Sequence, residues 1–204
     1  MDGEKSDHEP QRAGADGRVC SGTRGWLDQR TIDTAITDLP ARLHSMPTPP
    51  DSNDLSSWHK YFGAASNDEA WTLAEKATLW PEEIEALLNH AHSAALHWRA
   101  VGTPVNQNRA RLLLALAHCR AGHVATAKRF ATSVRAFNAV HDTPHWEQAL
   151  SAAISAYAAA ISGDAEAHAS HYAHAAALIA ALPEPEERAI VSATLAVVPK
   201  QLQM

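Results

Sequence analysis

Apolar residues recur every three or four positions from about residue 53 onward, which is the spacing of one face of an α-helix. Proline and glycine divide this pattern into segments of helical length. A proline often opens a segment, where its missing N–H is no loss, and a glycine often closes one. The pattern predicts an all-α domain over residues 51–199. Because the connections are only a few residues long, successive helices should pack as antiparallel neighbours.

The residues at these boundaries predict eight helices. Two short helices come first, the first capped by Ser52 or Asp54 and the second by Asn67. Two later helices begin with a Thr-Pro pair, at residues 103–104 and 143–144, in which threonine is the cap and proline the first helical residue. The expected limits of the remaining six are Pro81 to Gly102, Thr103 to Gly122, Val124 to Phe137, Thr143 to Gly163, Asp164 to Leu182 and Pro185 to Pro199.

Two of the expected hairpins show a weak internal repeat. Gly122 and Gly163 each separate two helices, and an alanine stands seven residues before each glycine. This arrangement resembles the tetratricopeptide repeat over residues 109–182, and the resemblance implies a TPR-like right-handed array of antiparallel helical hairpins. The period of about 41 residues is longer than the ~34 of that family, and His168 stands where the family has a small residue. Two segments also resemble small bacterial helical proteins of unassigned role, which implies a fold and no activity: ALHWRAVGTPVNQNRARLLL and GDAEAHASHYAHAA.

The first 50 residues differ from the rest of the chain. They hold five of the nine glycines and five of the eleven prolines, and they show only a weak helical period between Ile32 and Leu43. Such a segment has too little apolar area to offset the entropy of ordering it. We therefore expect a disordered N-terminal tail over residues 1–50. Met46 opens a stretch that reads as an alternative translation start.

Composition supports helices and narrows the possible partners. Alanine dominates the hydrophobic fraction of 46%, and aromatic residues make up only 6%, which favours helices over strands. The formal net charge of −6 gives no reason to expect a nucleic acid partner. The longest apolar run, Leu112 to Ala117, is far shorter than the ~20 residues of a membrane span. Two cysteines, Cys20 and Cys119, cannot build a disulfide framework, and we expect a cytoplasmic protein.

The charges are unevenly distributed along the chain. No Asp or Glu occurs between Glu85 and Asp142, whereas seven Lys and Arg residues fall in that stretch. Arg99 and Arg120 lie in the last turns of predicted helices, where a cation interacts favourably with the helix dipole. A solvated face is the expected explanation for the other five, and a patch for an anionic partner is the alternative.

Histidine is used unusually often, with thirteen in the chain. On a helical projection, His168 and Tyr172 lie on the apolar stripe of their helix, with His171 beside it. His118 stands in the most apolar helix, and His92 flanks the apolar stripe of another. No motif for nucleotide binding, zinc binding or a catalytic nucleophile accompanies them.

Arg109 and Glu147 complete a candidate site. Arg109 lies on the apolar stripe of its helix and needs a partner there, and Glu147 on the next-but-one helix is the expected partner. The imidazoles could ligate Zn²⁺ or Fe²⁺ with Glu147, hold a small anion, or act in acid–base chemistry. Separately satisfied core histidines are the simpler explanation. The candidate inward polar cluster comprises His92, Arg109, His118, Glu147, His168, His171 and Tyr172.

Two functional hypotheses follow from these patterns. Stacked helical hairpins create a groove, and such grooves bind peptides or partner helices. The first hypothesis is a protein-interaction module that binds a peptide or partner protein in a groove between hairpins, with bases of the acid-free stretch lining it and no cofactor. The alternative is a small helical enzyme or metal-binding protein that uses inward-facing histidines, with Zn or Fe as the metal. Neither nucleic acid nor a membrane is expected as a partner.

Overall fold

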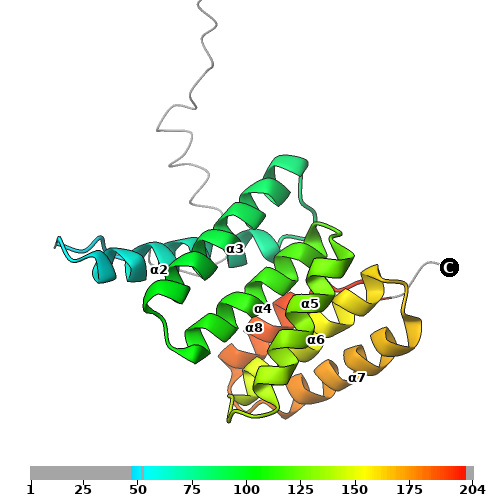
Figure 1. The fold of residues 1–204 in the computed structure, drawn as a ribbon. Coiled ribbons are helices and arrows are strands. Elements are labelled where there is room, and N and C mark those ends of the chain that lie inside the picture. Colours follow the sequence, from blue (N-terminus) through cyan, green and yellow to red (C-terminus); the bar gives the residue numbers. More distant parts are fainter. Residues whose placement is uncertain (1–46, 52, 201–204) are drawn as a thin grey trace, which may run out of the picture. The chain divides into compact units, whose positions relative to one another are not determined.

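The computed structural model describes residues 47–51 and 53–200, and this part of the chain contains seven α-helices and no β-strand (Figure 1). The all-α prediction is confirmed. The predicted tail lies, up to residue 46, outside the described residues. The helices are α2 (Leu55–Ala74), α3 (Pro81–Val101), α4 (Pro104–Arg120), α5 (Val124–Asn138), α6 (His145–Ile161), α7 (Ala165–Ala181) and α8 (Pro185–Ala196).

The helices pack in two rows. In the first row, α2 packs against α4, α4 against α6, and α6 against α8. In the second row, α3, α5 and α7 each pack against the two helices that precede and follow them in the chain, with no extensive contact among themselves in the described residues. Short connections make consecutive helices antiparallel, as expected.

α4 and α6 are the most deeply buried helices, because each has four other helices packed around it. Residues 112–117 of α4 are all between 0% and 4% exposed, which confirms that this run is covered on more than one side. Residues 149–160 of α6 are buried without interruption, and most of them are alanine. None of the described helices is both long enough and apolar enough to cross a membrane.

The two hairpin glycines have the backbone conformation that the sequence predicts. Gly122 has a φ of 70° and Gly163 a φ of 74°, which is the left-handed region. In each case the next residue donates its N–H to the carbonyl five residues earlier, over 2.9 Å after Gly122 and 3.1 Å after Gly163. The glycine N–H also bonds to a carbonyl three residues earlier. Both hairpins therefore turn through a Schellman motif.

Most of the predicted helix starts are confirmed. The Thr103 hydroxyl accepts a hydrogen bond from the backbone N–H of Asn106 at 3.3 Å, as expected of a helix cap. The Asp164 carboxylate accepts the backbone N–H of Ala167 at 3.0 Å. The first residues of α3 and α8 are prolines, in keeping with the prediction.

The first two predicted helices form a single helix, and this prediction was wrong. α2 runs without a break from its cap at Asp54, whereas Ser52 lies outside the described residues. Asn67 is half-buried within α2 and does not cap a second helix. α3 packs along this part of α2, where the hydroxyls of Ser66 and Ser93 lie 2.9 Å apart. Tertiary packing thus overrides the local capping preference of a polar run.

The start of α6 also differs from the prediction. Pro144 is the cap, with a non-helical ψ of 147°, and His145 is the first helical residue. The hydroxyl of Thr143, which was expected to cap this helix, is buried and has no hydrogen-bond partner in the described part of the chain. The side-chain amide of Gln148 instead donates to the Thr143 carbonyl at 2.9 Å. The hydrogen bond between residue 143 and the start of α6 is therefore formed by the Gln148 side chain and not by the Thr143 hydroxyl.

Replacing Gly122 by alanine should lower the free energy of unfolding by ~1 kcal/mol. A Cβ at this position would meet no atom within 4 Å, so the loss comes from the left-handed backbone and not from a clash. Gly122→Asn should lose less, because asparagine adopts this conformation more readily. Urea denaturation of the three proteins measures the difference. An alanine variant as stable as the parent would contradict the proposed origin of the turn.

Candidate functional site

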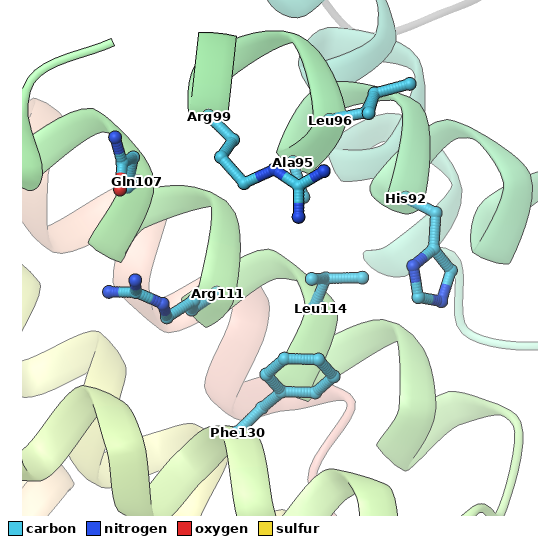
Figure 2. Close-up of a pocket in the computed structure, with 8 residues that line it drawn as sticks. All are labelled: His92, Ala95, Leu96, Arg99, Gln107, Arg111, Leu114 and Phe130. Atoms are coloured by element: carbon cyan, nitrogen blue, oxygen red, sulfur yellow. The ribbon is translucent and has the colours of Figure 1, made fainter.

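A cavity of about 430 Å³ lies between α3, α4 and α5. This volume falls within the range that is typical of small-ligand sites. α3 and α5 both pack on α4, so that α4 forms the floor of the cavity and the other two helices its sides (Figure 2). Its lining residues are His92, Ala95, Leu96 and Arg99 from α3, Gln107, Arg111 and Leu114 from α4, and Phe130 from α5.

Helical spacing explains why these side chains share one space. The α3 residues are three, four and seven positions apart, which places them on one helical face. Gln107, Arg111 and Leu114 have the corresponding spacing on α4, and His118 is the next residue of the same stripe. His118 therefore lies one turn beyond Leu114 on this stripe, although it does not line the cavity.

Two arginines of the cavity have no partner. Arg99 extends from α3 over the middle of the cavity, while Arg111 runs along its α4 side (Figure 2). Among the described residues, neither guanidinium has a hydrogen-bond or ion-pair partner. No lining residue is acidic, because the three helices have no Asp or Glu after Glu85. The cavity is thus a site of unneutralised positive charge.

The cavity also has apolar lining residues on the same helices as the arginines. Leu96 of α3 is 55% exposed, and Leu114 of α4 is buried. Phe130 closes the α5 side, and the guanidinium of Arg129 lies 4.8 Å from the centre of its ring. This is a cation–π distance. The cavity thus offers cations and an apolar surface to one ligand.

Three histidines, His92, His118 and His123, form an imidazole cluster next to the cavity. The rings of His92 and His118 lie 5.3 Å apart, and the Nδ1 atoms of His118 and His123 lie 3.0 Å apart. The His118 ring also stacks on Phe130 at 5.8 Å. His118 is only 7% exposed, and its Nε2 has no hydrogen-bond partner among the described residues. Because His92 and Phe130 line the cavity, the cluster borders it directly.

The surroundings of His118 favour its neutral form. Burial lowers the pKa of His118 to about 4, and the neighbouring His92, His123 and Arg129 act in the same direction. At neutral pH, His118 is therefore uncharged, and one of the two facing Nδ1 atoms donates a hydrogen bond to the other. Which of them donates depends on the tautomers.

The predicted ion pair between Arg109 and Glu147 is confirmed. Nε and Nη2 of Arg109 lie 2.8 Å and 2.5 Å from Oε1 of Glu147. Glu147 is almost completely buried, whereas the Arg109 side chain is 42% exposed and lies 5.3 Å from the Trp146 ring. The arginine thus neutralises a buried carboxylate and joins α4 to α6.

The other predicted site residues have separate partners. His168 is buried and donates from Nε2 to the Pro199 carbonyl at 2.7 Å, with the Tyr172 ring 5.8 Å away. His171 contacts the Arg135 guanidinium at 3.2 Å, and burial, Arg135 and His174 lower its pKa. No contact in the described part of the chain joins these residues to His118. The simpler explanation, individually satisfied histidines, therefore describes His168.

The structure also bears on the metal hypothesis. Among the described residues, no group of three or more His, Cys, Asp or Glu side chains is arranged to hold a metal ion. In the imidazole cluster, the closest pair of nitrogens faces each other at hydrogen-bond distance. The rings of His118 and His123 are thus in direct contact through these nitrogens.

Several residues of the cavity were not among the candidates. Arg99 has a sufficient local explanation as a cation near a helix C-terminus. Arg111 is one of the five basic residues of the acid-free stretch for which a solvated face is the expected explanation, and Phe130 lies in the same stretch. The acid-free stretch was the one signal that pointed to the cavity.

The ion pair should be strongly asymmetric in its effect on stability. Arg109→Met leaves the buried Glu147 carboxylate without a counter-charge and should cost ~3 kcal/mol of unfolding free energy. Glu147→Gln should cost less, since Arg109 can turn to solvent. In the double variant, part of the Arg109→Met loss should be recovered. Urea denaturation of all four proteins measures this, and strictly additive losses would contradict a direct interaction.

His118 should make the stability of the chain depend on pH. An unfolded histidine has a pKa of ~6.5, whereas His118 in the folded chain has a pKa of about 4. The unfolded chain thus binds the extra proton, and stability that is present above about pH 6.5 is lost as the pH falls toward 4. His118→Leu should flatten this dependence by up to ~1.4 kcal/mol per pH unit. Denaturation at several pH values tests it, and an unchanged slope would count against the buried neutral imidazole. His145→Gln, at an exposed position of α6, serves as the control.

The cavity is the place in the described part of the chain where unpaired cations, hydrogen-bond donors and an apolar wall meet. The imidazole cluster adds a buried titratable group at its edge. Searches with this chain find no matching family model, curated protein or solved structure.

Proposed function

We propose that this chain is a protein-interaction module that binds an acidic segment of a peptide or partner protein in the cavity between α3, α4 and α5. The single observation that carries the proposal is the pair Arg99 and Arg111. Both line one cavity, neither has a partner in the described part of the chain, and no acid is near them in the three helices. A ligand that brings carboxylates would supply the missing counter-charges.

The chemistry of the cavity fits a carboxylate next to an apolar group. A guanidinium binds a carboxylate through two parallel N–H donors, and such charge-assisted bonds are stronger than neutral ones. Gln107 adds a neutral polar side chain on the α4 side. Leu96, Leu114 and Phe130 provide the surface on which an apolar side chain of the same ligand can pack. A peptide that alternates acidic and apolar residues presents both groups.

The arrangement of the helices supports a repeat protein of this kind. α4 and α5 form one hairpin, α6 and α7 form the next, and both turn through the same glycine motif. Ala115 and Ala156, at the same distance before these glycines, are both fully buried. We interpret the two hairpins as TPR-like units, and arrays of such units present grooves to extended ligands.

Binding of a designed acidic peptide tests the proposal. The probe is a fluorescein-labelled hexapeptide of alternating glutamate and leucine, and its control has glutamine in place of glutamate. Fluorescence anisotropy at neutral pH and low ionic strength should show binding of the first peptide and weaker binding of the second. The variant Arg99→Gln/Arg111→Gln should bind the acidic peptide at least about tenfold more weakly, because two charge-assisted contacts are lost.

A matched variant separates the cavity from the general charge of the protein. Lys60→Gln/Lys128→Gln removes the same amount of charge at two exposed positions outside the cavity. It should bind the acidic peptide nearly as tightly as the parent. Equal binding of the two peptides, or equal losses in the two double variants, would overturn the proposal. So would the absence of any binding.

A further inference from the structure

The imidazole cluster places a buried titratable group beside the cavity, which the two arginines do not provide. His118 is buried, its Nε2 has no hydrogen-bond partner among the described residues, and its ring contacts two residues that line the cavity. These two residues are His92 and Phe130. Any charge that enters the cavity is therefore separated from His118 by a single layer of side chains.

The groups that act on His118 are all basic or neutral. His92 faces it from α3, and His123 and Arg129 face it from the α5 side. In the described part of the chain, α2 and α6, which also pack on α4, add no charged group to those that act on it. Without a ligand, a proton on His118 thus has cations around it and no carboxylate among the described residues to stabilise it.

An anion in the cavity would reverse this balance. A negative charge near an imidazole favours the protonated form and raises its pKa by about one to three units. The effect is larger where water is excluded, as it is around a buried ring. Since His118 starts from a low pKa, a rise of this size moves its protonation toward the mildly acidic range.

We propose that the cavity binds its anionic ligand together with a proton, which His118 takes up within the imidazole cluster. This inference rests on the proposed function and adds the way in which binding is regulated. The ligand is an acidic peptide segment whose carboxylates lie against Arg99 and Arg111. The bound state has the higher pKa, so binding strengthens as the pH falls and weakens as it rises.

The same labelled peptide of alternating glutamate and leucine measures the linkage with the full-length chain. Anisotropy titrations between neutral pH and about pH 5.5 keep the glutamates ionised. The affinity should rise about three- to tenfold over this range, since one proton taken up gives at most a tenfold change per pH unit. Calorimetry in two buffers of different ionisation enthalpy should show a net uptake of up to one proton for each peptide bound.

Variants of the cluster identify the groups that take up the proton. His118→Leu should retain peptide binding at neutral pH but lose most of the increase at low pH. His92→Gln/His123→Gln changes two exposed positions and keeps the test valid if His118→Leu does not fold. This variant removes the two imidazoles that lower the pKa of His118, so the rise in affinity should begin at a higher pH. His145→Gln lies outside the cavity and should leave the pH dependence unchanged.

The possible outcomes distinguish the proton linkage from the proposed function on which it rests. A chain that binds the peptide through Arg99 and Arg111 with a flat pH dependence overturns the proton linkage and leaves the interaction module standing. A pH dependence that is unchanged in His118→Leu, or that stays at the same pH in His92→Gln/His123→Gln, also overturns it. If the acidic peptide does not bind at any pH, the proposed function itself fails.

Discussion

The structure depends on the enclosure of α4 and α6, each of which has four other helices packed around it. A helix covered on every side must be apolar all round, and small residues let its neighbours approach closely. Leucine and alanine make up all of residues 112–117 of α4 and most of residues 149–160 of α6, which are the buried stretches. Each polar group on them then needs a specific reason to be there, since burying it without a partner is costly. Glu147 has such a partner in Arg109, whereas His118 has its Nδ1 contact and an Nε2 that has no partner in the part of the chain that the structure describes.

Two arginines of α4 differ in whether their charge is balanced by a carboxylate. Arg109 faces α6 and meets a carboxylate, so the pair is electrically neutral and holds two helices of the first row together. Arg111, two residues further along, faces the cavity and meets no carboxylate in the described residues. The cavity thus keeps a charge, whereas the contact between α4 and α6 is neutral. Charge retained in this way costs some stability through repulsion and favours an anionic ligand.

The sequence predicts those features that depend on one residue and its local backbone. Glycine adopts the φ values of Gly122 and Gly163 without strain, so the turns follow from the sequence. An arginine on an apolar stripe needs a carboxylate, and this requirement predicts Glu147 as its partner, although Glu147 is the more deeply buried of the two. The prediction for Asn67 was wrong because a polar run can either cap a helix or continue one, and the packing of α2 against α3 decides between these two outcomes. The cavity depends on how three helices are rotated against one another, and no local pattern contains that information.

The turn at Gly122 also fixes the chemistry beside the cavity. The backbone N–H of His123 bonds to the carbonyl of His118 across this turn, at 2.9 Å. The same five-residue span brings the two imidazole rings to 3.0 Å between their Nδ1 atoms. A residue inserted in this loop would lengthen the five-residue span and change the relative position of the two rings. Loop length at this hairpin therefore constrains the contact between the two imidazoles as well as the chain reversal.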